Sequence, residues 1–189
     1  MDRPQPTRAQ EEVILVDADD RPVGTCERAL AHAKGGRRHR AFSVYLFDSA
    51  GRLLLQQRGA QKPLWPGFWS NSCCSHPRPG EDVDAAAHRR VREELGLTAT
   101  LTPLFRYEYC SDYAALGTEH EVVHVYIGQA DPAAVRANPD EVAAWRMIEC
   151  AELEREITDA TRYTPWFQLA WPRARDGQRA RAGRDGAAD

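Results

Sequence analysis

Several features are missing from this sequence of 189 residues. No apolar run approaches the roughly 20 residues that a membrane-spanning helix needs, and no secretory signal follows the polar residues 1–10. The net charge of −3 gives no reason to expect nucleic acid as a partner. The five cysteines are odd in number, and their spacing is not that of a disulfide framework or a zinc knuckle. These absences predict a cytoplasmic protein with free thiols and with no membrane or nucleic-acid partner.

The two ends of the chain differ in composition from its middle. Residues 1–10 are polar and contain two prolines, and residues 173–189 hold no apolar side chain larger than alanine. Neither segment can bury enough apolar surface to order itself, so both are predicted to be disordered. The intervening residues 11–172 suit one globular domain, since 42% of the chain is hydrophobic.

Strand and helix signals alternate along this middle part. Val83, Ala87, Val91 and Leu95 form an apolar stripe that predicts a helix over residues 82–95, and Gly96 ends it. The other predicted helices are 26–33, 151–157 and one that opens at Thr164-Pro165, and the predicted strands are 13–16, 42–47, 53–57, 69–74, 104–109, 121–127 and 144–148. This interleaving predicts an α/β or α+β fold with a mixed sheet.

Glu119 and Glu121 are two residues apart on a predicted strand, so their carboxylates point to the same face. A solvated edge strand explains such a pair as well as a cation site does. His32, His39 and His76 are each compatible with a structural role. Together with the two carboxylates, however, three imidazoles make a nitrogen and oxygen set that suits Mn²⁺, Mg²⁺ or Zn²⁺.

Cys73 and Cys74 are adjacent on a predicted strand, so one thiol is expected in the core and the other in a cleft. A buried cysteine is inert by default, whereas a thiol near a metal or a guanidinium can exchange protons.

Four charged residues of the predicted helix over residues 82–95 are spaced to interact with one another: Arg89, Arg90, Glu93 and Glu94. Two i,i+4 ion pairs would explain them. Alternatively, Glu94 holds a Mg²⁺ that bridges to phosphate oxygens, with Arg58 and Lys62 as further cations for a diphosphate.

A longer pattern joins these residues. Residues 65–77, WPGFWSNSCCSHP, resemble the signature of type I isopentenyl-diphosphate isomerases, in which the active-site cysteine falls on Cys74. Residues 75–97 resemble a degenerate Nudix box, with Ser75 in place of its opening glycine and Arg90 in place of a catalytic glutamate of the hydrolases. The residues that fit the box are Glu81, Arg89, Glu93, Glu94 and Gly96.

The resemblance implies a Nudix-type fold, a mixed sheet flanked by helices, and an isomerase of isoprenoid biosynthesis that interconverts isopentenyl and dimethylallyl diphosphate through a tertiary carbocation. Cys74 and Glu121 would work on opposite sides of the alkene, assisted by Tyr107. The implied metal ligands are His32, His39, His76, Glu119, Glu121 and Cys74, with Glu94 for a diphosphate-bridging Mg²⁺. The implied substrate contacts are Arg28, Arg58, Lys62, Arg90 and Trp166.

Arg28 stands where the relatives have lysine, and only Lys34 and Lys62 of the 25 basic residues here are lysine. We therefore interpret the change as preserving the charge, although the two side chains differ in geometry. No flavin is expected, and both a monomer and a homodimer are compatible with the sequence. The alternatives are a Nudix hydrolase, which Arg90 disfavours, and a binding module with a vestigial metal site.

Overall fold

The computed structural model describes residues 11–185, so the predicted disorder of residues 1–10 and of 186–189 lies outside the described residues. Nine strands in this range form one mixed sheet. The strands are β1 (Glu12–Val16), β2 (Pro22–Glu27), β3 (His39–Phe47), β4 (Leu53–Arg58), β5 (Trp69–Ser70), β6 (Cys73–Ser75), β7 (Leu101–Tyr113), β8 (Gly117–Gln129) and β9 (Val142–Ile148). The helices are α1 (Arg28–Ala31), α2 (Val83–Leu95), α3 (Cys150–Glu156) and α4 (Pro165–Asp185), with a short 3₁₀ turn at Pro132–Ala134.

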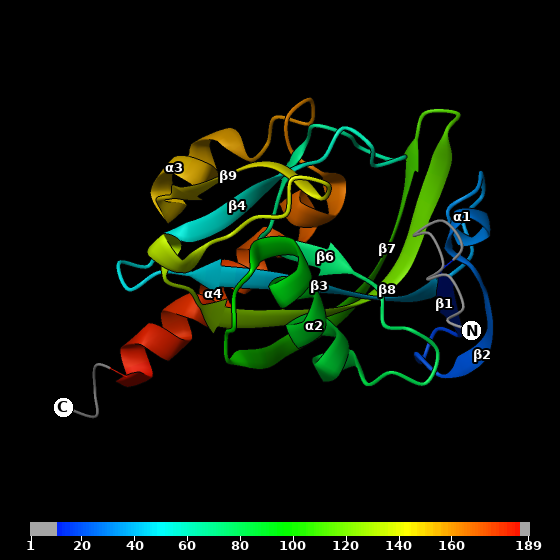
Figure 1. Ribbon diagram of the computed structural model, residues 1–189, viewed down its shortest axis with the longest axis horizontal. Helices are drawn as coiled ribbons and strands as arrows, with labels where there is room; N and C mark the ends of the chain where they lie inside the picture. Colours follow the sequence, from blue (N-terminus) through cyan, green and yellow to red (C-terminus); the bar gives the residue numbers. More distant parts are fainter. Residues whose placement is uncertain (1–10, 186–189) are drawn as a thin grey trace, which may run out of the picture.

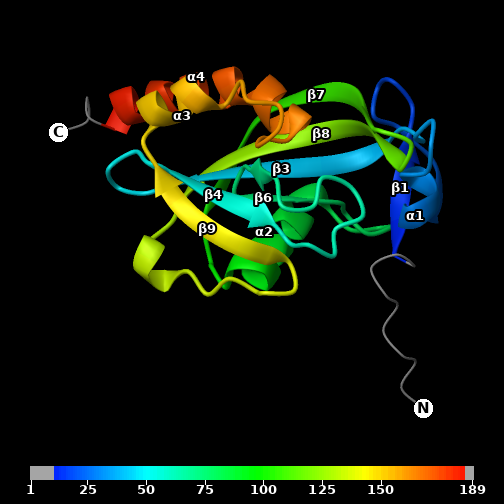
Figure 2. The same cartoon turned by 90° about the horizontal axis from the view of Figure 1, so that it is seen from above.

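Helices cover both faces of the sheet. Figure 2 shows α3 and α4 on one face and α2 on the opposite face. Strand β3 runs through the middle and pairs with β1, β4, β6 and β8, the last of these in parallel. Its side chains alternate, with Tyr45 and Phe47 in the core under α4 and Val44 and Leu46 in the core under α2. The predicted α+β fold with a mixed sheet is confirmed.

The predicted helix over residues 82–95 is confirmed as α2. Asp82 is its N-cap, where the side chain accepts a hydrogen bond from the Ala85 backbone N–H at 3.1 Å. Gly96 ends the helix at a positive φ of 67°, and a Cβ there would lie 2.9 Å from the Arg136 carbonyl oxygen. Local capping signals therefore define both ends of this helix.

Residues 173–185 continue helix α4, so the predicted disorder of this segment is wrong. Ala174 is fully buried, and the Arg173 guanidinium lies 3.8 Å above the centre of the Phe105 ring. Arg175 pairs with Glu154 at 2.8 Å. The prediction considered only large apolar residues, whereas alanine and arginine favour helix and arginine stems cover apolar surface.

Several predicted elements also have other boundaries than expected. The predicted helix 26–33 is reduced to α1, because β2 pairs with β1 as far as Glu27. The predicted strand 69–74 is split into β5 and β6, because the Asn71 side chain donates to the backbone carbonyls of Val44 and Cys73. Strands β7 and β8 are 13 residues each and form a long hairpin, which Figure 1 shows beside α1.

None of the helices in the part of the chain that the structure describes is both long and apolar enough to cross a bilayer.

Candidate active site

Four predicted metal ligands converge at one end of strand β3. His39 begins β3 and lies opposite Glu121 of β8 in the parallel register. His32 directly follows α1, and His76 directly follows β6. The ligand atoms of the four residues all lie within 4.8 Å of one another. The fold therefore brings two segments that are distant in the sequence, residues 32–39 and His76, to the same carboxylate.

A single oxygen of Glu121 faces all three imidazoles. Its Oε1 lies 2.9 Å from Nε2 of His76, 3.4 Å from Nε2 of His39 and 3.6 Å from Nε2 of His32. All four side chains are at most 10% exposed. Such a buried convergence of nitrogen and oxygen atoms is the geometry of a site for a divalent cation.

Backbone carbonyls determine which nitrogen of two histidines carries the proton. Nδ1 of His32 donates to the carbonyl of Arg28 at 2.8 Å, and Nδ1 of His39 donates to the carbonyl of Arg37 at 2.7 Å. In the neutral form of each ring, Nε2 then carries the lone pair, as in metal-binding histidines. Nε2 of His32 is buried and has no hydrogen-bond partner among the described residues. These residues fit a metal ion, which would satisfy the facing lone pairs.

The pKa values of the cluster agree with metal binding. Burial lowers the pKa of His76 to about 3, so its imidazole is neutral. Burial alone would raise the pKa of Glu121, but contacts with the three histidines outweigh it and bring that pKa well below its ordinary value. A neutral imidazole beside an ionised carboxylate is the protonation state that a metal requires.

Tyr109, which sequence reasoning missed, contacts both carboxylates. It lies opposite Glu121 in the β7–β8 register, and its hydroxyl is 2.6 Å from Glu119 and 2.9 Å from Glu121. Burial and the charge of Glu121 raise the pKa of Glu119. Tyr107, the predicted tyrosine, instead donates to the Trp166 carbonyl at 3.3 Å. The signal was present, because tyrosines two residues apart on one strand share a face.

Glu119 lies beside the four-ligand group but is not part of it, and the same holds for Cys74. The Cys74 thiol donates to the Asn71 side-chain oxygen at 3.0 Å and lies 3.3 Å from the Ser43 hydroxyl. Burial raises the pKa of Cys74 to about 11, so the group is a thiol that can donate a proton. Cys73 points to the other face and is fully buried under α2, as the strand alternation predicted.

A small cavity of about 30 Å³ connects the thiol to the carboxylates. Cys74, Tyr109, Glu121 and Trp166 all line it. The Trp166 indole N–H donates to the Ser70 hydroxyl at 3.1 Å, which fixes the ring at the cavity wall. Cys74, Glu121 and Trp166, which were predicted as site residues, therefore line one cavity, whereas the predicted Tyr107 does not line it.

A larger cavity of about 580 Å³ opens outside this small one. The two share Arg28, Arg58, Lys62 and Glu119 as lining residues. Arg58 is buried, donates to the carbonyls of Trp65 and Leu64, and lies 5.0 Å over the Trp166 ring. The predicted diphosphate-binding cations thus surround the passage between the two cavities, where an anionic group would be stabilised.

Arg90 and Glu94 form the predicted i,i+4 ion pair, buried at an Nη2–Oε1 distance of 2.5 Å. The other oxygen of Glu94 accepts from the Gln56 amide at 3.3 Å. Nε of Arg90 and Nε of Arg28 are buried and lack hydrogen-bond partners among the described residues. Both arginines line a third small cavity beside His76.

Comparisons with known proteins agree with this geometry. The NUDIX domain family matches residues 37–169. An isopentenyl-diphosphate Delta-isomerase of Pectobacterium atrosepticum is 45% identical over 166 residues, 87% of this chain and 92% of the relative. The enzyme of the same name from Nocardia farcinica is 47% identical over 91% of this chain and 99% of the relative.

Solved structures show the same fold at lower identity. DR0079 from Deinococcus radiodurans superimposes with a TM-score of 0.68 at 23% identity, over 86% of this chain and 98% of that one. A MutT NUDIX hydrolase from Burkholderia pseudomallei has a TM-score of 0.56 at 23% identity, over 72% of this chain and 98% of that one. The chain therefore belongs to the NUDIX domain family and, within it, to the isopentenyl-diphosphate Delta-isomerases.

Proposed function

We propose that this isomerase interconverts isopentenyl and dimethylallyl diphosphate in the small cavity between Cys74 and Glu121. The observation that carries the proposal is that a protonated thiol and an ionised carboxylate line one small cavity, together with the Trp166 indole. The substrate's alkene would lie in this cavity and its diphosphate among the cations at the passage to the larger one.

The reaction requires one proton to be added and another to be removed. Protonation of the terminal alkene carbon gives a tertiary cation, and loss of a proton from the neighbouring methylene forms the new double bond. Cys74 and Glu121 would serve these two steps from opposite sides, and the direction of the reaction decides which one donates. Tyr109 would hold the Glu121 carboxylate in place through its hydroxyl.

The indole of Trp166 would present its ring to the cation, an interaction of about 2 kcal/mol when water is excluded. The ring is 3% exposed, and Trp65 packs edge-on against it with the ring centroids 5.2 Å apart. This packing would keep water away from a cation that water would otherwise convert to an alcohol.

His32, His39, His76 and Glu121 would hold a divalent ion, Mn²⁺, Mg²⁺ or Zn²⁺, with Glu119 and Cys74 as neighbours. When bound, the ion would stabilise the negative charge of the carboxylate.

Glu94 would contribute to a Mg²⁺ site for the diphosphate. Support comes from Gln56, whose amide nitrogen donates to Glu94 and whose side-chain oxygen is buried without a hydrogen-bond partner among the described residues. The cytoplasmic location remains a prediction from the free thiols.

Proton NMR in D₂O tests the proposal. Purified protein is incubated with isopentenyl diphosphate and Mg²⁺, and a Cys74→Ala protein serves as the control. Dimethylallyl diphosphate with deuterium in its methyl group, formed only by the unmodified protein, is the expected result. An unchanged alkene contradicts the proposal, and release of phosphate would indicate the hydrolase activity instead.

A further inference from the structure

Glu141, directly before β9, connects two candidate phosphate-binding cations from different parts of the chain. Its Oε2 lies 2.5 Å from the Lys62 ammonium, and its Oε1 lies 3.3 Å from Nη2 of Arg90. The carboxylate is buried, with its side chain 10% exposed. Neither the motifs of the sequence nor the proposed catalytic steps account for this residue.

The backbone around Glu141 is fixed on both sides. Its carbonyl accepts from the Gly59 N–H at 3.0 Å, which attaches it to the loop that carries Lys62. Its own N–H donates to the Asn138 carbonyl at 3.0 Å, and the Asn138 N–H donates to the Glu94 carbonyl at 2.8 Å. The carboxylate is therefore held between the end of α2 and the loop after β4, and it cannot easily withdraw from the cavity.

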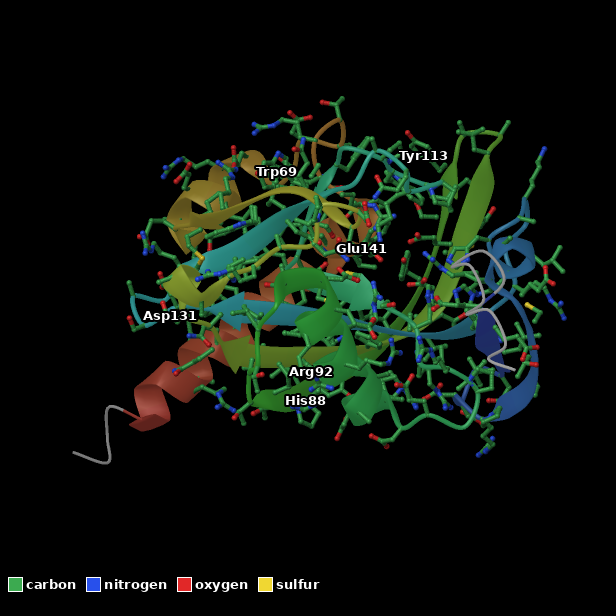
Figure 3. All side chains as sticks on the ribbon, in the orientation of Figure 1. Trp69, His88, Arg92, Tyr113, Asp131 and Glu141 are labelled. Atoms are coloured by element: carbon green, nitrogen blue, oxygen red, sulfur yellow. The ribbon has the colours of Figure 1, made fainter. Side chains whose placement is uncertain are left out.

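The same carboxylate lines the 580 Å³ cavity together with Lys62 and Arg58. Figure 3 places Glu141 near the middle of the molecule, above α2, and His88 and Arg92 on the lower side of that helix. Arg90 is shared between Glu141 and Glu94, so two buried carboxylates lie against one guanidinium. A diphosphate that approaches Lys62 must approach the negative charge of Glu141 as well.

We propose that Glu141 makes diphosphate binding in this cavity depend on an accompanying divalent cation. A free diphosphate carries several negative charges and is repelled by the carboxylate, whereas a diphosphate complexed with a divalent cation is repelled much less. Glu141 thereby acts on specificity, by selecting the metal complex, while it positions Lys62 and Arg90. The inference rests on the proposed function only in taking a diphosphate as the ligand.

The test measures the dissociation constant of inorganic pyrophosphate by calorimetry, once with EDTA and once with Mg²⁺. The ratio is the dissociation constant in EDTA divided by the dissociation constant in Mg²⁺. A larger ratio means that pyrophosphate binding depends more strongly on the cation, and the measurement needs no turnover. Glu141→Gln is expected to lower this ratio about tenfold, the effect of one nearby like charge. EDTA would also remove a metal ion held by His32, His39, His76 and Glu121, in every variant alike, so only differences between variants are interpreted.

Glu93→Gln is the matched control. Glu93 pairs with the same Arg90 at 2.6 Å, but its side chain is 39% exposed and it does not line the large cavity. Its ratio is expected to equal that of the unmodified protein. An unchanged ratio in Glu141→Gln, or an equal fall in Glu93→Gln, would overturn the proposal.

Lys62→Gln gives an independent measurement if Glu141→Gln does not fold. Without the ammonium the charge of Glu141 is less compensated, so the ratio is expected to rise. A ratio that stays the same or falls would contradict the proposal. The isomerase assay on the unmodified protein is separate, so its failure would count against the proposed function and leave the pyrophosphate result interpretable.

Discussion

The histidine cluster (His32, His39, His76 and Glu121) and the charge cluster (Lys62, Arg90, Glu94 and Glu141) are both buried and polar, but they are balanced differently. In the histidine cluster, lone pairs face one another and one carboxylate oxygen. In the charge cluster, two cations and two carboxylates compensate one another within the chain.

This difference indicates which cluster requires a bound ion and which is complete without one. The histidine cluster contains no lysine or arginine, and burial keeps the His76 imidazole neutral, so a metal ion would complete it. The charge cluster is already neutral without a ligand, so it is organised before any metal or substrate arrives. We therefore expect a bound metal ion at the histidine cluster to increase the free energy of unfolding. At the charge cluster, we expect the free energy of unfolding to depend on the intact ion pairs instead.

The largest expected effect comes from removing the charge at the centre of the histidine cluster. Glu121→Gln should reduce isomerisation by about 10²–10⁴-fold and weaken metal binding, because it removes a proton-transfer group and a ligand together. Turnover of isopentenyl diphosphate and metal content by mass spectrometry measure both. Glu119→Gln is the neighbouring control and should lose less metal. An equal loss would place Glu119 among the ligands.

Breaking the charge cluster should cost stability rather than metal affinity. Arg90→Gln leaves Glu94 and Glu141 poorly compensated and should lower the free energy of unfolding by about 3–5 kcal/mol. Urea unfolding with and without EDTA measures this, and the loss should be the same in both. Arg92→Gln, at an exposed position of α2, should stay within about 0.5 kcal/mol. If the loss of unfolding free energy in Arg90→Gln disappeared in EDTA, the charge cluster would also depend on a metal ion, and the two clusters would not differ in this respect.

Chelation should destabilise the protein through the histidine cluster alone. With metal at 100 times its dissociation constant, its removal should lower the free energy of unfolding by about 2.7 kcal/mol. Thermal unfolding should show a shift of several degrees in the unmodified protein and almost none in His39→Gln. An equal shift in both proteins would mean that the metal stabilises some other part of the chain.

The smallest expected effect concerns Asp20, a carboxylate that forms ion pairs with other residues than those of the charge cluster. Burial raises its pKa, but Arg40 and His124 outweigh burial, so the pKa is lowered below its usual 3.8. Its contribution is therefore present above pH 3.8 and is lost as the pH falls through the lower, folded-state pKa. Asp20→Asn, which suits the positive φ of 67°, should destabilise the protein by about 1 kcal/mol or less at pH 7.

Thermal unfolding of both proteins from pH 7 to pH 3 measures this effect. The difference between their melting temperatures should shrink below pH 3.8. A difference that grows as the pH falls would show that the charge of Asp20 does not stabilise the fold.

Much of the fold and site could be predicted from the sequence because the signals were local. Asp82, the apolar stripe and Gly96 predicted α2 almost to the residue, since capping and periodicity act within one element. The signature around Cys74, and the resemblance that implied His32 and His39 as ligands, identified residues that the fold brings together. The family follows from the same motifs and is confirmed by the relatives.

Other features could not be predicted, because they depend on which strands and loops meet. The β7–β8 register places Tyr109, not Tyr107, opposite Glu121. The ordering of residues 173–185 depends on Phe105 and Glu154, which lie far away in the sequence.

The sequence by itself therefore determined the family, the helix that carries Glu94 and the side chains that converge in the histidine cluster. Only the tertiary structure decided which tyrosine reaches the carboxylates, that helix α4 includes residues 173–185 and that Glu141 lies between Lys62 and Arg90. The physical reason is the range of the interactions. Caps, periodicity and motif spacing act over a few residues, whereas register and buried charge pairing are settled only when distant segments pack together.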